Sequence, residues 1–235
     1  MNSPNRTAII VLSVCTVLVF TAKAVSDSKP ASLFNGKDLT GWKTVGGKGI
    51  NQWTVGKASL DTAKPSKLNV DKSGSELISP ESGANLASAE TFGDCIVELE
   101  FMISEGSNSG IKMMSIYEIQ ILDSAAKAKV DSGDCGAVYK ENAPSVNACK
   151  KAGDWQQLLI EFRAPRFDLG GKKISNAKFV RVLLNGQLVQ ENVEVAHGTN
   201  VSRNAPEHPT GPIFFQGDHG PVAFRNIKVA RLDLD

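Results

Sequence analysis

Apolar and polar residues alternate in several short runs along this sequence. The pattern is clear in residues 96–103, 117–122 and 155–162. A period of two residues places one row of side chains toward an interior and the other row on an outer face. These runs therefore predict β-strands that each have one buried face.

Turn residues separate the alternating runs, and helical patterns are scarce. Residues 179–184 and 187–190 flank Asn185-Gly186, a pair that tolerates the positive φ angles of a type I′ turn, so a β-hairpin is predicted here. Only residues 124–129 look briefly helical. Many short strands joined by turns indicate an all-β sandwich or barrel.

The same pattern extends to both ends of the chain. Residues 213–216 and 222–229 read as the last two strands, and residues 43–90 contain strand fragments such as 52–55 between long loops. No internal repeat or low-complexity linker divides the chain. A single domain over residues 31–235 is therefore predicted.

The first residues have the features of a secretory signal. Arg6 precedes an uncharged apolar run over residues 7–20, and Ala22-Lys23-Ala24 gives a small-x-small cleavage pattern. The run is shorter than the roughly 20 residues that a membrane-spanning helix needs. We predict a cleaved signal peptide over 1–24, a short leader over 25–30, export to the periplasm or the cell exterior, and no membrane attachment after cleavage.

Charge and cysteine content limit the partners of the mature chain. Without Arg6 and Lys23, 24 basic and 25 acidic residues remain, which gives no basis for nucleic-acid binding. Three mature cysteines remain, so one thiol is left over. A Cys135–Cys149 bridge would close about 15 residues and contribute ~3 kcal/mol, whereas Cys95 sits in an apolar strand. The sequence leaves both the pairing and the oligomeric state open.

Polar residues suited to chemistry gather at two places, the strand at 117–122 and the last hairpin. They are Glu118, Gln120, Asp123 and Tyr139 near the first, and Gln216, Asp218, His219 and Arg225 at the second. Each has an ordinary interpretation as a solvated strand residue, a turn former or an exposed ion-pair partner. Together, carboxylates, an imidazole and a guanidinium are the groups that move a proton and stabilise the resulting charge. The residues alone favour neither interpretation.

Two tryptophans are candidates for sugar stacking. Trp42 follows Gly41, and Trp155 follows Gly153-Asp154 at the head of a strand. An aromatic face suits the C–H groups of a sugar ring. A core or edge position is the more ordinary interpretation for both.

Several motifs in one order make the sequence similar to the 3-keto-disaccharide hydrolase family. The opening motif is Leu33-Phe34-Asn35-Gly36-Lys37-Asp38-Leu39-Thr40-Gly41-Trp42. The later motifs are residues 107–111, 117–124, 135–139, 152–156, 164–168 and 216–227. Lys112-Met113-Met114 departs from the family pattern, which usually has an aromatic and more polar segment there, and Gly217 interrupts the motif before Asp218.

The resemblance implies a concanavalin-like, jelly-roll β-sandwich of two curved antiparallel sheets with a site on the concave side. It also implies hydrolysis of glycosides oxidised at C3 by removal of the C2 proton, elimination and hydration. We assign Glu118 as the base, His219 as the acid, Arg225 as the enolate stabiliser and Asp123 as the residue that orients Arg225 or His219. The expected substrate-binding residues are Asn108, Gln120, Tyr139, Trp155 and Gln216.

Other functions fit the same sequence. No resident cofactor or metal is assigned, although a divalent metal could take over part of the role of Arg225 as a Lewis acid. A non-catalytic carbohydrate-binding module is the main alternative, because this fold also serves lectins. A domain that holds a partner protein on its concave face is the third.

Overall fold

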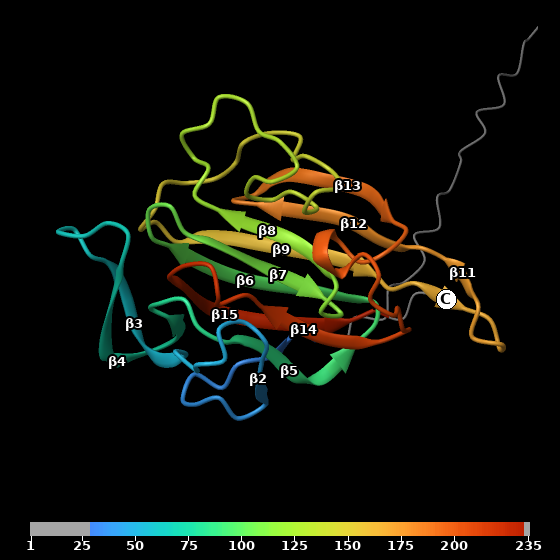
Figure 1. The fold of residues 1–235 in the computed structure, drawn as a ribbon, viewed down its shortest axis with the longest axis horizontal. Helices are drawn as coiled ribbons and strands as arrows, with labels where there is room; N and C mark the ends of the chain where they lie inside the picture. Colours follow the sequence, from blue (N-terminus) through green and yellow to red (C-terminus); the bar gives the residue numbers. More distant parts are fainter. Residues whose placement is uncertain (1–28, 233–235) are drawn as a thin grey trace, which may run out of the picture.

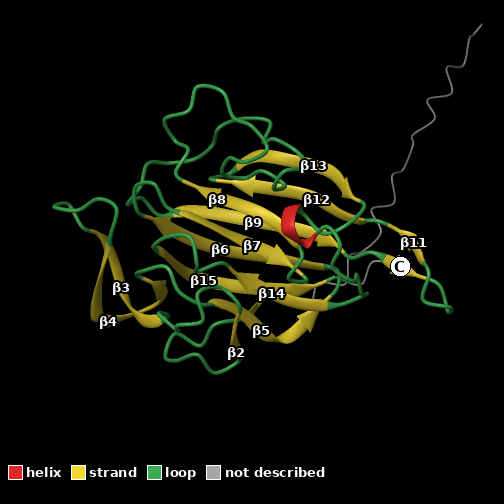
Figure 2. Cartoon of the chain, in the orientation of Figure 1, coloured by secondary structure: helices red, strands yellow, loops and turns green. Residues whose placement is uncertain are grey.

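The computed structural model describes residues 29–232. These residues form two large antiparallel β-sheets packed face to face, a separate pair of short strands, and one short 3-10 helix, Asn200–Ser202 (Figures 1 and 2). The predicted all-β sandwich of two antiparallel sheets is therefore confirmed. The predicted signal peptide and most of the leader lie outside the described residues. Within residues 29–232, no helix is long and apolar enough to cross a membrane.

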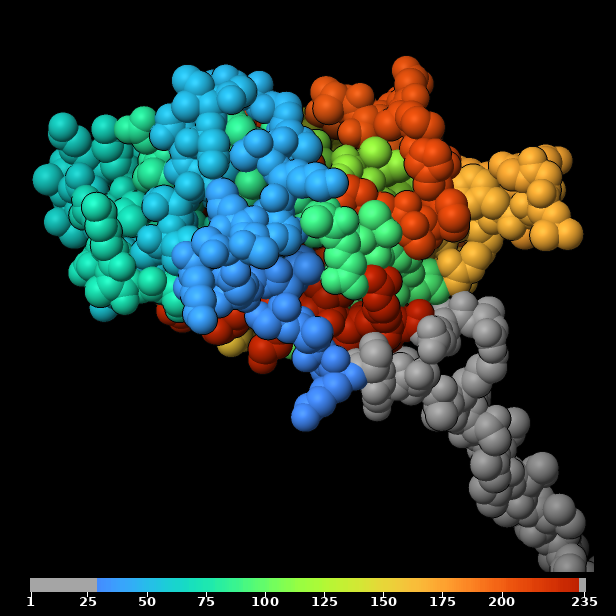
Figure 3. Space-filling model, turned by 90° about the horizontal axis from the view of Figure 1, so that it is seen from below, coloured from blue at the N-terminus to red at the C-terminus, as the bar shows by residue number. Residues whose placement is uncertain are grey.

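The larger sheet has eight strands. Its order is β13 (Gln187–Val195), β12 (Ala177–Leu184), β9 (Gln156–Arg163), β6 (Cys95–Ile103), β15 (Val222–Arg231), β4 (Leu68–Ser79) and β3 (Thr54–Leu60). The short β1 (Ala31–Ser32) pairs with β15. Figure 3 accordingly shows the blue N-terminal residues beside red C-terminal ones. Both ends of the described chain are thus held in one sheet.

The smaller sheet has five strands. Its order is β2 (Trp42–Val45), β5 (Asn85–Phe92), β14 (Gly211–Phe215), β7 (Asn108–Met113) and β8 (Tyr117–Leu122). A separate pair, β10 (Arg166–Phe167) and β11 (Lys173–Ser175), extends from the sandwich (Figure 1). The strand that carries Glu118, β8, is therefore an edge strand of the smaller sheet.

The hydrophobic core lies between the two sheets and accounts for the alternation in the sequence. Phe215 of the smaller sheet meets Phe224 of the larger sheet, with ring centroids 4.7 Å apart. Trp42 packs 5.0 Å from Phe215 and is itself buried, so its interpretation as a core aromatic is confirmed. Removal of these apolar surfaces from water, at about 25 cal/mol per Å², is the main stabilising contribution.

Two local predictions have opposite outcomes. The hairpin at Asn185-Gly186 is confirmed, with φ angles of +53° and +80° at the two turn residues. The brief helix expected over residues 124–129 is wrong, because this stretch forms turns, one of them closed by the Lys127 N–H donating to Ser124 O at 3.0 Å. A stretch of six residues is too short to offset the cost of helix nucleation.

Candidate active site

Glu118 and Gln120 lie on the outer face of the smaller sheet, on strand β8. The residues that alternate with them point into the core. The ordinary interpretation as solvated strand residues is wrong, because Glu118 is only 3% exposed and Gln120 only 2%. Buried polar groups need hydrogen-bond partners or a ligand. The burial of Glu118 and Gln120 therefore distinguishes this face from an ordinary solvent-exposed sheet surface.

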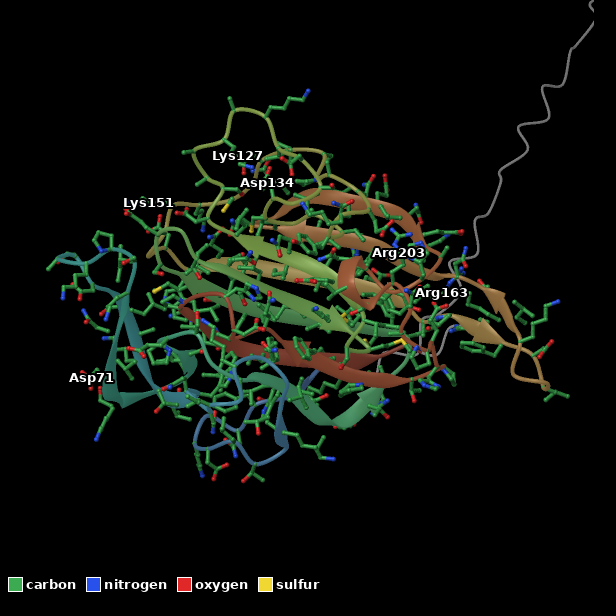
Figure 4. All side chains as sticks on the ribbon, in the orientation of Figure 1. Asp71, Lys127, Asp134, Lys151, Arg163 and Arg203 are labelled. Atoms are coloured by element: carbon green, nitrogen blue, oxygen red, sulfur yellow. The ribbon has the colours of Figure 1, made fainter. Side chains whose placement is uncertain are left out.

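Two loops contact the strand that carries these residues (Figure 1). The Tyr139 N–H donates to Glu118 O at 3.0 Å, which places Tyr139 beside the catalytic candidate. The Glu118 N–H donates to Thr199 Oγ1 at 3.1 Å. An ion pair of 2.8 Å between Glu141 and Arg203 joins the two loops, and Figure 4 labels Arg203. The two loops therefore cover the backbone of Glu118.

The carboxylate of Glu118 is paired with a buried ammonium group. Lys112 is the direct partner of Glu118 in the β7–β8 register, and its Nζ lies 3.3 Å from Glu118 Oε2. The same Nζ lies 5.3 Å from the centroid of the Phe214 ring, in a cation–π contact. A side chain at Gly110 would obstruct this arrangement, because its Cβ would come within 2.4 Å of Glu118 Oε1. Lys112 and Phe214 were not among the predicted site residues.

The surroundings of Glu118 adjust its proton affinity. Burial raises the pKa of Glu118, and the Lys112 ammonium opposes this rise. The charges of His219 and Asp218 also act on this pKa, so the last turn lies within electrostatic reach of the carboxyl group. A desolvated carboxylate with a raised pKa next to a cation is suited to act as a general base.

The turn between β14 and β15 brings an imidazole to this face. His219 Nδ1 lies 2.6 Å from Asp218 Oδ1 and 3.0 Å from Gln216 Nε2. Asn85 holds the turn in place, since its Oδ1 accepts a hydrogen bond of 2.8 Å from the Gly217 N–H. A carboxylate next to an imidazole fixes its orientation for proton transfer. The turn therefore supplies a second proton-transfer group on the face that carries Glu118.

Two carbonyl oxygens on this face lack a partner. Gln120 Nε2 donates to Asn108 Oδ1 at 3.4 Å and to Gly133 O at 3.2 Å. The Oε1 atoms of Gln120 and Gln216 are buried and accept no hydrogen bond within the described part of the chain. Leaving such an acceptor unpaired costs about 1–3 kcal/mol. Ligand hydroxyl groups that donate to these atoms would remove that cost.

Comparison with known proteins places this chain in a family. Residues 29–230 match the family described as the 3-keto-alpha-glucoside-1,2-lyase-like domain. The chain belongs to this family. A comparison with curated proteins gives no match.

Solved structures resemble this 3-keto-alpha-glucoside-1,2-lyase-like domain along most of its length. A candidate glycosyl hydrolase from Parabacteroides distasonis ATCC 8503 has 27% sequence identity and a TM-score of 0.68, and the match covers 87% of this chain and 84% of that chain. A second candidate glycosyl hydrolase from the same organism has 18% identity and a TM-score of 0.55, with 86% and 93% covered. The second likeness concerns the fold alone.

In this 3-keto-alpha-glucoside-1,2-lyase-like domain, Arg225 and Trp155 lie away from Glu118. Arg225 is on β15 of the larger sheet, and its neighbour Phe224 points into the core. The Arg225 side chain therefore faces outward, where its Nε donates to Glu100 Oε2 at 2.7 Å and its Cζ lies 4.1 Å from the centroid of the Trp155 ring. The prediction that Arg225 and Trp155 share a hollow with Glu118 is wrong, because the core separates the two outer faces.

Asp123 has a different task from the predicted one. Its Oδ2 accepts a hydrogen bond of 2.9 Å from the Gly106 N–H, and its own N–H donates to Ser107 O at 3.1 Å. These bonds hold the turn between β6 and β7. The prediction that Asp123 orients Arg225 or His219 is wrong. Arg225 is bound to Glu100 on the other sheet, and Asp218 and Gln216 contact the His219 ring instead.

Metal ligands of the usual kind are not grouped in the domain. Within residues 29–232, no three His, Cys, Asp or Glu side chains are arranged to hold a metal ion. The metal-assisted version of the reaction stays a prediction that no observation tests.

Replacement of Arg225 with glutamine tests the assignment of this residue to the opposite face. Because Arg225 binds Glu100 and Trp155 rather than the site, the turnover number of the variant is expected to stay within about twofold of the unchanged protein. The measurement is steady-state turnover with the substrate that the unchanged protein cleaves. A fall of about tenfold or more in a folded variant would return Arg225 to the site.

Proposed function

We propose that this domain cleaves 3-keto glycosides by removing the proton at C2 of the oxidised sugar. The observation that carries the proposal is the buried pair of Glu118 and Lys112, a carboxylate of raised pKa next to an ammonium group. A ketone at C3 acidifies the C2 proton, so one base and one cation near the ketone oxygen are sufficient. Ordinary glycosidases instead place two carboxyl groups on either side of the glycosidic bond.

The first half of the proposed reaction is an elimination. The Glu118 carboxylate takes the C2 proton, and the electron pair of that bond moves toward C3 to give an enolate. The Lys112 ammonium stabilises the negative charge on the C3 oxygen, the role that Arg225 cannot fill from the opposite sheet. When the ketone re-forms, a C1–C2 double bond forms, the C1–O bond breaks, and the leaving oxygen takes a proton from His219.

The second half is a hydration that restores every group. Water adds at C1 of the unsaturated ketone, and His219 takes one of its protons. Glu118 exchanges its proton with the incoming water and then protonates C2. The sum is hydrolysis of the glycosidic bond, and both proton carriers end in their starting states.

The remaining polar groups of this face are assigned to substrate binding. The unpaired Oε1 atoms of Gln120 and Gln216 would accept hydrogen bonds from sugar hydroxyls, with Asn108 and Tyr139 beside them. The half-buried Phe214 ring offers an apolar surface for sugar C–H groups, which is the task predicted for Trp155. The signal-like N-terminal sequence supports a reaction outside the cytoplasm.

Turnover in heavy water tests the chemistry. The protein is incubated in D₂O with a 3-keto-α-glucoside and, separately, with the matching unoxidised glucoside, and the products are followed by mass spectrometry. We expect cleavage of the oxidised sugar alone, with one deuterium at C2 of the product beyond the exchange seen without protein. Cleavage without C2 deuterium would overturn the proposal, and binding of either sugar without cleavage would favour the carbohydrate-binding alternative.

A further inference from the structure

Two cysteine thiols meet at the end of the strand that carries the site residues. The side chains of Cys135 and Cys149 interact with each other closely enough to shift the pKa of both thiols. Both also contact Leu122, the last residue of β8: Cys149 Sγ lies 3.6 Å from Leu122 O, and Cys135 has a hydrogen bond with the Leu122 backbone. Both cysteines are free thiols in the structure, as is Cys95.

The segment that contains Cys135 forms one side of the candidate site. Ala137 O accepts a hydrogen bond of 3.0 Å from the Gln120 N–H, and the Gly136 N–H donates to Gln120 O at 2.8 Å. Gly133 O accepts from the Gln120 side chain at 3.2 Å. Covalent attachment of Cys135 to a second point would therefore stabilise the backbone beside Gln120.

The segment that contains Cys149 returns to the same place from the far end of the loop. Asn147 Nδ2 donates to Ser124 O and Lys127 O, at 2.9 Å each. Lys127 in turn forms an ion pair of 2.6 Å with Asp134, and Figure 4 shows these two labelled residues together in this loop. The loop over residues 123–150 is thus closed on itself by non-covalent contacts, with the two thiols at its base.

The two thiols differ in reactivity, and Cys95 differs from both. The Cys135 hydrogen bond lowers the pKa of Cys149 to about 7, and this residue is partly exposed. The hydrogen bond with Cys149 and burial raise the pKa of Cys135. Burial raises the pKa of Cys95 to about 12. The thiolate is the reactive form, so Cys149 is suited to attack and Cys135 to follow.

We propose that Cys135 and Cys149 form an oxidation site that closes into a disulfide when the protein meets a disulfide oxidant. The Cys149 thiolate attacks one sulfur of the oxidant, forms a mixed disulfide and releases one thiolate. Cys135 then loses its proton and attacks the Cys149 sulfur of the mixed disulfide, which releases the second thiolate. The pair loses two electrons and two protons in total, and the oxidant is reduced to two thiols. The inference does not rest on the proposed sugar chemistry.

Peptide mapping tests the pairing directly. The full chain is incubated with oxidised glutathione or with dithiothreitol, remaining thiols are alkylated, and the protein is digested with trypsin. Cleavage after Lys140 separates the two cysteines into peptides 130–140 and 141–150. After oxidation we expect these peptides as one linked species with the mass of their sum less two hydrogens. Alkylation of both peptides after oxidation, or a link from either to Cys95 or Cys15, would overturn the proposal.

Two variants and a thermal measurement distinguish a Cys135–Cys149 disulfide from oxidation at any other cysteine. Cys95→Ser is the matched control and is expected to keep the link. In Cys135→Ala, the glutathione adduct is expected to accumulate on Cys149, whereas an adduct elsewhere would contradict the assigned order of attack. Oxidation is expected to raise the melting temperature of the unchanged protein by roughly 6–12 °C, and that of Cys135→Ala not at all. An equal rise in both would refute the cross-link.

Discussion

Replacing Glu118 with glutamine is expected to lower turnover of a 3-keto-α-glucoside by roughly 10²–10⁴-fold, the usual contribution of a general base. Glutamine keeps the shape of the side chain and fills the space beside Gly110, but it cannot accept the C2 proton. The variant should still bind the substrate, because the acceptors on Gln120 and Gln216 remain. The measurements are steady-state turnover, substrate affinity by calorimetry, and incorporation of deuterium at C2.

Glu100→Gln is the matched control for this variant. Glu100 lies on the larger sheet, where its carboxylate binds Arg225, so the same chemical change occurs on the opposite outer face. Turnover of Glu100→Gln is expected to stay within about twofold of the unchanged protein. Near-normal turnover of Glu118→Gln would remove Glu118 as the base. Equal losses in both variants would indicate a general effect on the fold.

The sequence determined which residues point outward but not which outer face they share. Alternation placed Glu118 and Arg225 correctly on outward positions of their strands. A sandwich has two outer faces, and the strand order that assigns each strand to a sheet depends on long-range pairing that a single sequence does not display. Nearness in the sequence therefore groups Arg225 with His219, six residues earlier, although the strand of Arg225 belongs to the larger sheet.

Glu118 and Gln120 are also more deeply buried than the alternation of polar and apolar residues predicts. The period-two pattern gives an outward direction for Glu118 and Gln120, but their burial comes from loops that fold back against β8, as the hydrogen bonds of Tyr139 and Thr199 show. Lys112 had no clear signal in the sequence, because the turn that sets its register has positive φ at Met114 and Ser115 without a glycine or asparagine to mark it. Residues 114–116 form the short turn between β7 and β8, so Lys112 falls opposite Glu118 in register.

The second large effect is expected when Lys112 is replaced with methionine. The change leaves a buried carboxylate without its cation, and removing one partner of such a pair costs about 3–5 kcal/mol of unfolding free energy near neutral pH. Turnover should also fall, since the proposed stabiliser of the enolate is lost. The measurement is chemical denaturation monitored by fluorescence at several pH values. Methionine keeps the apolar stem over Phe214, so the loss of charge dominates.

The pH dependence identifies the cause of that loss. Burial raises the pKa of Glu118 in the folded state above its ordinary value of 4.5, and removing Lys112 raises it further. Between 4.5 and the raised value, the folded state binds a proton that the unfolded state lacks, so stability falls as pH rises through this window and the penalty is complete above it. The deficit of Lys112→Met should therefore shrink as the pH is lowered toward 4.5.

The double variant Lys112→Met/Glu118→Gln separates charge from packing. With no carboxylate left to desolvate, it is expected to regain most of the stability that Lys112→Met loses, and its deficit should not vary with pH in the carboxyl range. A deficit that stays the same at low pH, or a double variant as unstable as Lys112→Met, would show that Lys112 acts through packing alone. In that case the Lys112 ammonium would not measurably stabilise the Glu118 carboxylate. Its assignment as the enolate stabiliser would then be wrong.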